Sequence, residues 1–335
     1  MLRKTNKYNT LFFVLGALAL CVMVYHIGFE IIVGNISETG WWFAAIVGIW
    51  LPVYLLNAWS WRVIIHDEKS VRAPFWTILK LTVSGYAINY VTPVVALGGE
   101  PYRILELQRH VGGKKATSSV LLYSMIHMTS HLLFWLTAAV LAVAVFRPSP
   151  AVNAALGVAA ALCVAGGVCF LKAYRKGLLM KTIRIANKIP FVKKMVRKIS
   201  AEQLEKINET DQQIAHLYTC RRSDFYKSLA LEYLARIVSC LEVYFIVLAL
   251  GLNFTFINAV IIIAITSLIA NILFFAPMQL GAREGGFMLA FQGIATASGL
   301  GIYVSLITRI REAFWILIGL ILMKIKEKKH DEEIF

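Results

Sequence analysis

Eight long apolar segments constrain this chain more than any other feature of its sequence. They lie at residues 11–33, 41–59, 75–95, 118–146, 151–171, 228–250, 256–276 and 301–323. A helix needs about 20 mostly apolar residues to span a bilayer, and most of these segments reach that length. Charged residues make up 16% of the chain, and the mean hydropathy is +0.68, whereas soluble domains carry about 25% charged residues. The sequence therefore predicts an all-α, polytopic integral membrane protein that forms a single membrane domain over residues 1–335.

The net charge of +15 raises the question of a nucleic-acid partner. The basic residues gather in the loops between apolar segments, which is how membrane proteins set their orientation. Anionic lipid head groups are then the expected partners of the surplus charge, and nucleic acid is not expected. We predict a multi-pass protein of the cell membrane, most simply a bacterial inner membrane.

The positions of the basic residues also predict which segments do not cross. Region 172–227 carries fourteen Lys and Arg against five Asp and Glu, which predicts a cytoplasmic, amphipathic region. Basic residues near both ends of the chain predict cytoplasmic N- and C-termini. Eight full crossings cannot satisfy these three placements. We therefore expect about six full spans and two re-entrant helical hairpins, at about residues 75–112 and 256–299.

Helix-breaking residues support the two hairpins. Those expected to break them are Pro93, Gly98, Gly99, Pro277, Gly281 and Gly285. The stretches "PVVALGGE" and "PMQLGARE" each place a proline seven residues before a glutamate. Because the two hairpins are predicted to enter from opposite sides, they indicate an inverted repeat of the kind that builds many transporters. Non-helical backbone at membrane depth is tolerated where protein or a watery cavity surrounds it, so a cavity is expected between them. After the first break we expect a short helix with Pro101 at its start and Gly112 as its stop.

Charged residues directly follow both breaks. They are Glu100 and Arg103 in the first hairpin and Arg283 and Glu284 in the second. A charge at membrane depth costs about 2.5–3.5 kcal/mol on insertion scales. The N-terminus of a helix offers unpaired N–H groups and about half a positive charge. With an arginine added, it suits a phosphate or carboxylate, while the glutamates either pair with the arginines or hold a cationic group. We predict that these four residues bind substrate.

The last apolar segment contains a further group of charges. Arg309 and Glu312 are three residues apart and share one helix face, so they can pair. An internal ion pair that sets helix register and a role in binding a charged head group both remain open. Arg311 is predicted to point elsewhere, toward the outer interface.

His127 and His131 lie four residues apart on one face of the fourth segment. That spacing can hold zinc, but the glutamate of the protease motif H-E-x-x-H is replaced by Met128, and no third ligand is near in sequence. We expect no metal and no cofactor, and we assign these histidines to polar packing or substrate contact.

Two stretches carry a resemblance to a known family. They are "TPVVALGGEPYRILELQRHVGGKKATSSVLL" and "APMQLGAREGGFMLAFQGIATASGLGIYVSLITRIREAFW". They resemble the flippase-like membrane domain of lysylphosphatidylglycerol synthases, and the likeness runs over about residues 10–325. We expect a stand-alone member without the soluble aminoacyl-transferase domain, and lysyl transfer by this chain alone is therefore not expected.

The resemblance implies a translocator that moves a polar-headed lipid between leaflets. Family residues that it carries over are Pro93, Gly98, Gly99, Glu100, Arg103, Pro277, Gly281, Glu284 and Arg309. The family also places an arginine in the helix after the first hairpin. This chain has none there, which raises the question of whether His127 or His131 takes its place.

Three functions are therefore compared. The first is a lipid translocator that binds a polar or charged head group in a central charged cavity. Its substrate is an anionic phospholipid, an aminoacyl-phospholipid or a polyprenyl-linked lipid. The alternatives are a secondary transporter of a small solute or ion and a membrane-embedded transferase that uses a lipid-linked donor. No catalytic motif is found, so an enzyme is not expected, and a homo-oligomer stays open.

Overall fold

The computed structural model describes most of the chain as packed helices. It covers residues 27–66, 73–91, 98–146, 149–176, 201–273, 281–295 and 298–325, a few single residues between 13 and 25, and residues 183, 187 and 279. The helices are α2 (Phe29–Thr39), α3 (Trp42–Gly48), α4 (Trp50–Ile65), α5 (Phe75–Val91), α6 (Gly99–Val111), α7 (Gly113–Phe146), α8 (Pro150–Lys176), α11 (Ala201–Cys220), α12 (Arg222–Ser239), α13 (Leu241–Ala249), α14 (Phe256–Ile272), α15 (Ala282–Ala295) and α16 (Ser298–Lys324). No strand occurs among these residues, which confirms the all-α prediction.

Three helical stretches of the described chain are long and apolar enough to cross a membrane. They are Trp42–Ile65, Gly113–Phe146 and Pro150–Lys172, and α14 is a shorter apolar helix. The 34 residues of α7 rise about 50 Å, well beyond the roughly 30 Å of a hydrocarbon core. Only 6% of the apolar window of α8 is buried, so its apolar side chains face outward, as lipid contact requires. The chain is a multi-pass membrane protein.

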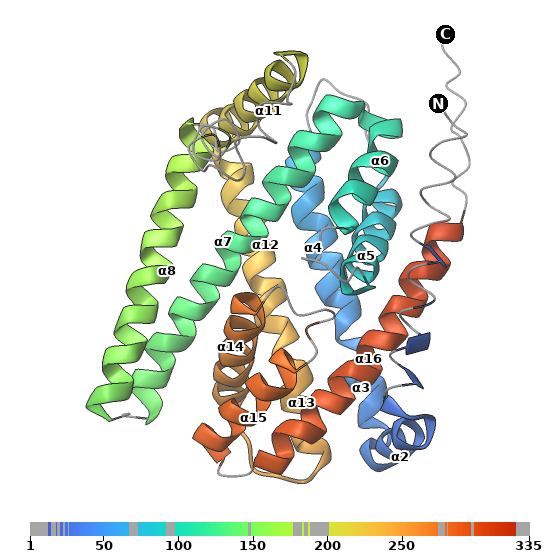
Figure 1. The fold of residues 1–335 in the computed structure, drawn as a ribbon, viewed down its shortest axis with the longest axis vertical. Helices are drawn as coiled ribbons and strands as arrows, with labels where there is room; N and C mark the ends of the chain where they lie inside the picture. The colour runs from blue at the N-terminus through green and yellow to red at the C-terminus, as the bar shows by residue number, and fades with distance from the viewer. Residues whose placement is uncertain are drawn as a thin grey trace.

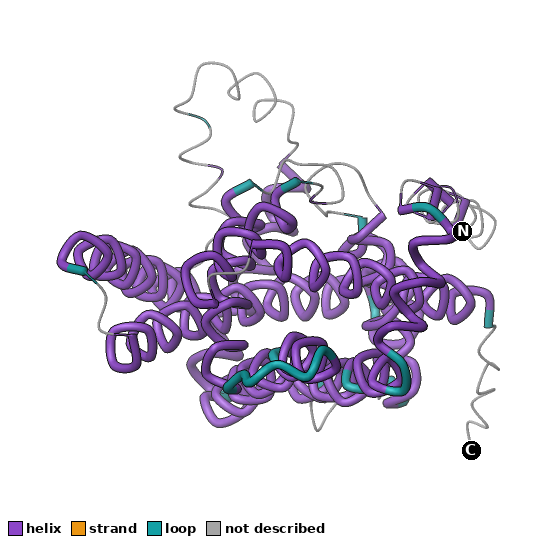
Figure 2. The backbone as a smooth tube through the Cα atoms, turned by 90° about the horizontal axis from the view of Figure 1, so that it is seen from below, coloured by secondary structure: helices purple, strands orange, loops and turns teal. Residues whose placement is uncertain are grey.

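The helices pack around α12, which contacts α4 on one side and α7 on the other (Figure 1). Helix α16 lies against α5 and α15, and α13 packs on α3 and α14. Helices α7 and α8 run side by side at the left of Figure 1, and α11 lies across their upper ends. Seen from below in Figure 2, short loops join the helices. The core is divided into separate apolar clusters. One contains Trp61, Tyr123 and Phe225, and another contains Phe287 and Phe291.

Each predicted hairpin is a pair of helices packed against each other. Helices α5 and α6 form the first pair, in the upper half of Figure 1, and α14 and α15 form the second, in the lower half. Helix α6 ends at Gly112, whose φ of 79° is the left-handed conformation that glycine allows. The predicted stop is confirmed, although α6 begins two residues before Pro101.

The helix-breaking residues fall into different places. Pro93 and Pro277 lie outside the described residues. Gly98 directly precedes α6, and Gly281, with a φ of 79°, directly precedes α15. Gly285 lies inside α15, so the prediction that it breaks a helix is wrong. The break precedes it, because the left-handed backbone at Gly281 already separates the two helices.

Gly99 is required by the close approach of α6 to α5. A Cβ atom at this position would lie 2.2 Å from the carbonyl oxygen of Gly85 and 2.7 Å from Oδ1 of Asn89. The backbone N–H of Gly99 donates a hydrogen bond to that same Asn89 oxygen at 2.7 Å. The side chain of Asn89 therefore caps the start of α6 from the neighbouring helix.

We predict that Gly99→Ala destabilises the fold. The added methyl group forces α6 away from α5, and overpacking of this kind costs about 1–3 kcal/mol. The midpoint of thermal unfolding in detergent should fall. Gly157→Ala on α8 is the matched control, because its Cβ would meet nothing within 4 Å. An equal midpoint for Gly99→Ala and Gly157→Ala would contradict the predicted close contact.

Candidate functional site

A polar cavity of about 340 Å³ lies among the helices. Its lining comes from α4, α5, α7, α12, α13, α14, α15 and α16. The ionisable residues that line it are His127, His131, Glu232, Arg236, Glu242, Arg283 and Arg311. Asn89 and Tyr90 near the end of α5 and Asn271 near the end of α14 also line it. The ends of α5 and α14 therefore border one cavity.

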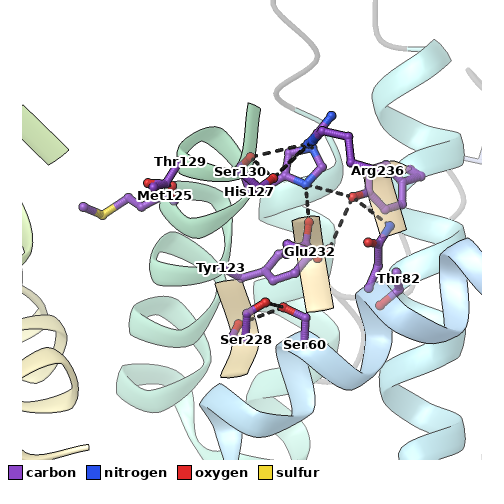
Figure 3. A network of polar contacts seen from close by, with 12 residues as sticks. Ser60, Thr82, Tyr123, Met125, His127, Thr129, Ser130, Ser228, Glu232 and Arg236 are labelled. Carbon is purple, nitrogen blue, oxygen red and sulfur yellow. Dashed lines mark hydrogen bonds and ion pairs between the residues drawn. The ribbon is translucent and has the colours of Figure 1, made fainter. Parts of the chain in front are cut away.

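One cluster in this cavity joins α7 to α12 (Figure 3). Nδ1 of His127 lies 2.7 Å from Oε2 of Glu232, whose side chain is 1% exposed. Nε2 of the same imidazole lies 3.5 Å from Nη2 of Arg236. Arg236 also donates to the hydroxyl of Ser130 at 3.1 Å. His127 therefore lies between a carboxylate and a guanidinium that belong to the same helix.

Tyrosine hydroxyls extend this cluster toward α5. The hydroxyl of Tyr86 lies 3.3 Å from that of Tyr123 and 3.4 Å from Nδ1 of His127. The amide of Asn57 donates to the Tyr86 hydroxyl at 3.5 Å. Helices α4, α5, α7 and α12 are thus connected by hydrogen bonds in the interior.

A second cluster joins α13 to α16. Nε and Nη2 of Arg311 bind the two carboxylate oxygens of Glu242 at 2.7 and 2.8 Å. The guanidinium lies 3.8 Å from the ring centroid of Trp50, and the indole N–H of Trp50 donates to Glu242 at 3.0 Å. Arg311 is 1% exposed and Glu242 is 2% exposed. The prediction that Arg311 points to the outer interface is wrong, because this bidentate partner draws it inward.

A third cluster joins α15 to α16. Arg283 binds one oxygen of Glu312, and Nη1 of Arg309 lies 3.4 Å from the other. Nε of Arg309 lies 3.1 Å from Glu284. The predicted pairing of Arg309 with Glu312 is therefore confirmed. Arg283 is the member of this cluster that lines the cavity.

Glu284 also has a local role at the start of α15. Its second oxygen accepts a hydrogen bond from the backbone N–H of Gly281 at 2.7 Å. A glutamate in the first turn that reaches back to the residue before the helix is half of a capping box. Glu284 thus stabilises the helix start, and its side chain remains 34% exposed.

In the first hairpin, Arg103 and Glu100 contact other groups and do not pair with each other, so the first of the two predicted alternatives does not hold here. Arg103 is 2% exposed and donates to the backbone carbonyls of Leu81 and Thr82 at 3.4 and 3.3 Å. Its guanidinium also lies 4.8 Å from the ring of Tyr86. Glu100 accepts from the amide of Asn89 at 3.3 Å. Among the described residues, the cavity lining includes neither Glu100 nor Arg103, and their contacts Asn89 and Tyr86 do line it.

His131 lines the cavity beside His127, with the two ring centroids 5.2 Å apart. Within the described residues, no three His, Cys, Asp or Glu side chains lie where they could together hold a metal ion. Both histidines therefore belong to the polar lining, as substrate contact would require.

Three charged lining residues were missed by the analysis of the sequence. Glu232, Arg236 and Glu242 all lie in or next to the apolar segment 228–250. Ionisable residues inside an apolar segment mark functional sites, and that signal was available. Their spacing of four and six residues does not reveal that they face the same cavity, because α12 ends between Arg236 and Glu242.

The fold and this site define a class: a helical, multi-pass membrane protein with a polar cavity inside an apolar shell. Within that class the family is shown by the sequence. The chain belongs to the lysylphosphatidylglycerol synthase TM region family, which it matches over residues 10–319, and the resemblance noted above is confirmed. Comparisons with curated proteins and with solved structures give no match. The family indicates a role connected with membrane lipids.

We predict that Arg311→Met strongly destabilises the protein, because it leaves Glu242 buried without its partner. Breaking a buried pair from one side costs about 3–5 kcal/mol. The double variant Arg311→Met with Glu242→Leu should recover most of the lost stability. Thermal unfolding in detergent measures both.

The control for this pair is Arg109→Met, whose side chain is 41% exposed and whose partner Glu106 is half-buried at 17% exposed. It should change the unfolding midpoint little. A double variant no more stable than Arg311→Met alone would show that the pair is not the cause of the loss.

Proposed function

We propose that this protein is a lipid translocator that moves a polar-headed lipid between leaflets. The head group enters the cavity while the acyl chains stay in the bilayer. The observation that carries this proposal is a cavity lined from both hairpins and charged by Arg283, Arg311, Arg236 and two glutamates. The family's connection with membrane lipids supports the same function.

The physical barrier to lipid movement is the transfer of a charged head group through hydrocarbon. Unpaired charges in apolar surroundings are very costly, and fixed protein charges can replace the water that the head group loses. Hydrogen bonds from several helices fix the positions of the charged clusters in this cavity. The free energy of ordering these charges is therefore spent during folding and not when the lipid enters. This is transport without covalent chemistry, and we therefore propose no enzymatic step.

We further propose the membrane arrangement that this function needs. It has about six full spans, and the α5–α6 and α14–α15 pairs are re-entrant hairpins that enter from opposite leaflets as an inverted repeat. Residues 172–227 and both termini are cytoplasmic, in a bacterial inner membrane. The placement of the two pairs in opposite halves of Figure 1 supports this arrangement.

Translocation can be measured in vesicles that contain a fluorescent phospholipid and the purified protein. A quencher outside removes only outer-leaflet fluorescence, so movement of lipid appears as loss beyond half. Arg283→Gln should slow this movement at least tenfold, because it removes a cavity charge and leaves Glu312 with one partner fewer.

The matched control is Lys114→Gln, whose side chain is 66% exposed outside the cavity and which should behave as the unmodified protein. Equal rates for Arg283→Gln and Lys114→Gln would exclude the cavity as the path. Vesicles that move no lipid but take up a soluble solute with a proton gradient would support the secondary transporter instead.

The membrane arrangement has its own test. Single cysteines at Gly113 and at Asn253, introduced after removal of the native cysteines, should react with an impermeant thiol reagent from opposite sides. Gly113→Cys should react only from the cytoplasm and Asn253→Cys only from outside. Labelling of both from one side would contradict the two opposed hairpins.

A further inference from the structure

The lining of the cavity points to a particular kind of head group. We propose that Glu232 and Arg236 bind the two opposite charges of a zwitterionic phospholipid, with a primary ammonium on Glu232 and the phosphate on Arg236. Phosphoethanolamine is the chemistry that fits best. This inference rests on the proposed function, because it names the head group that the translocator would accept.

The other two arginines that line the cavity already have carboxylate partners. Arg311 uses two nitrogens for Glu242, and Arg283 binds Glu312. Within the part of the chain that the structure describes, Arg236 has no carboxylate within ion-pair distance. A ligand that bound Arg283 would compete with a buried ion pair. Arg311 keeps Nη1 without a partner, but its charge is already balanced by Glu242, whereas Arg236 has no paired carboxylate among the described residues.

Glu232 has one carboxylate oxygen that is not used. Its Oε2 contacts His127, but its Oε1 is buried and accepts no hydrogen bond, and the side chain is 1% exposed. A buried acceptor without a donor is unfavourable, and a carboxylate more so than a neutral group. An ammonium group from a ligand in the cavity would supply the missing donor.

His127 explains why these two charges do not simply pair with each other. Residues four apart on a helix commonly form an ion pair, yet His127 stands between Glu232 and Arg236 and contacts both (Figure 3). The imidazole and Ser130 position Arg236 from α7. The carboxylate and the guanidinium are thus held one turn apart and remain available to a ligand.

The spacing favours a short linker between the ligand's charges. Side chains at positions i and i+4 have Cβ atoms about 5–6 Å apart. The two-carbon linker of phosphoethanolamine separates its ammonium from its phosphate by a similar length. An aminoacyl-phosphatidylglycerol carries its ammonium beyond a glycerol and an ester, which makes the separation longer.

The charge balance of the site favours a ligand without net charge. Apart from the two histidines, the arginines and glutamates of the three clusters are equal in number: Arg236, Arg283, Arg309 and Arg311 against Glu232, Glu242, Glu284 and Glu312. Of these, Arg309, Glu284 and Glu312 do not line the cavity themselves. A zwitterion leaves this balance unchanged. A net anionic head group would add an uncompensated charge at membrane depth, which is costly.

The test is a direct binding measurement with short-chain lipids and the full-length protein in detergent. Calorimetry should show that dihexanoyl phosphatidylethanolamine binds at least tenfold more tightly than dihexanoyl phosphatidylglycerol. A short-chain alanyl-phosphatidylglycerol should bind more weakly than the ethanolamine lipid. Equal affinity for the ethanolamine and glycerol lipids would overturn the proposal, and tighter binding of the alanyl lipid would overturn the choice of phosphoethanolamine.

Two variants test the carboxylate and the guanidinium separately. Glu232→Gln keeps the shape but removes the charge, and should lower the affinity for the ethanolamine lipid to that for the glycerol lipid. Arg236→Gln should weaken both lipids. The control is Glu209→Gln. Glu209 lies on α11, away from the cavity, and pairs with Lys114 on α7, so its substitution should change neither affinity. Equal weakening of both lipids by Glu232→Gln would contradict ammonium binding at this residue.

Binding and translocation can fail independently, so the two proposals remain distinguishable. Selective binding without movement of lipid in vesicles would remove the translocator but keep the zwitterion site. Movement of ethanolamine and glycerol lipids at equal rates, without selective binding, would keep the translocator and remove the site assignment.

Discussion

The ion pair between Arg311 and Glu242 shows the constraint on which the interior depends: a charge inside an apolar shell needs compensating partners, either an opposite charge or fixed hydrogen bonds. Both side chains are almost fully buried, and Trp50 contacts both of them. Because the partners lie on α13 and α16, the pair also determines how these helices meet. Such pairs contribute little net stability over apolar packing, so their presence is better explained by the polar cavity that they border.

Two helices end beside the cavity. These are α5 and α14, and the helices that follow them, α6 and α15, begin a few residues later in the chain. The helix starts are satisfied locally: Asn89 accepts from Gly99 at the start of α6, and Glu284 accepts from Gly281 at the start of α15. Broken helices are costly in an apolar medium unless their backbone groups find such partners. The two hairpins meet this requirement with different residues.

The outside and inside of the molecule have opposite polarity, and both matter for the proposed transport. Exposed apolar side chains such as Val158 and Leu162 on α8 suit acyl chains. The cavity, in contrast, presents arginine, glutamate and histidine. A lipid has the same division between its tails and its head group. The structure thus offers each part of a lipid a matching environment.

The sequence by itself determined the properties that depend on neighbours along the chain. Apolar length predicted the helices and the membrane, Gly112 predicted the end of α6, and a spacing of three residues predicted the pairing of Arg309 with Glu312. The tertiary structure alone decided that Arg311 turns inward and that His127 joins Glu232 to Arg236. The reason is physical. A spacing along one helix sets which side chains share its face, whereas partners on other helices are set by how those helices pack.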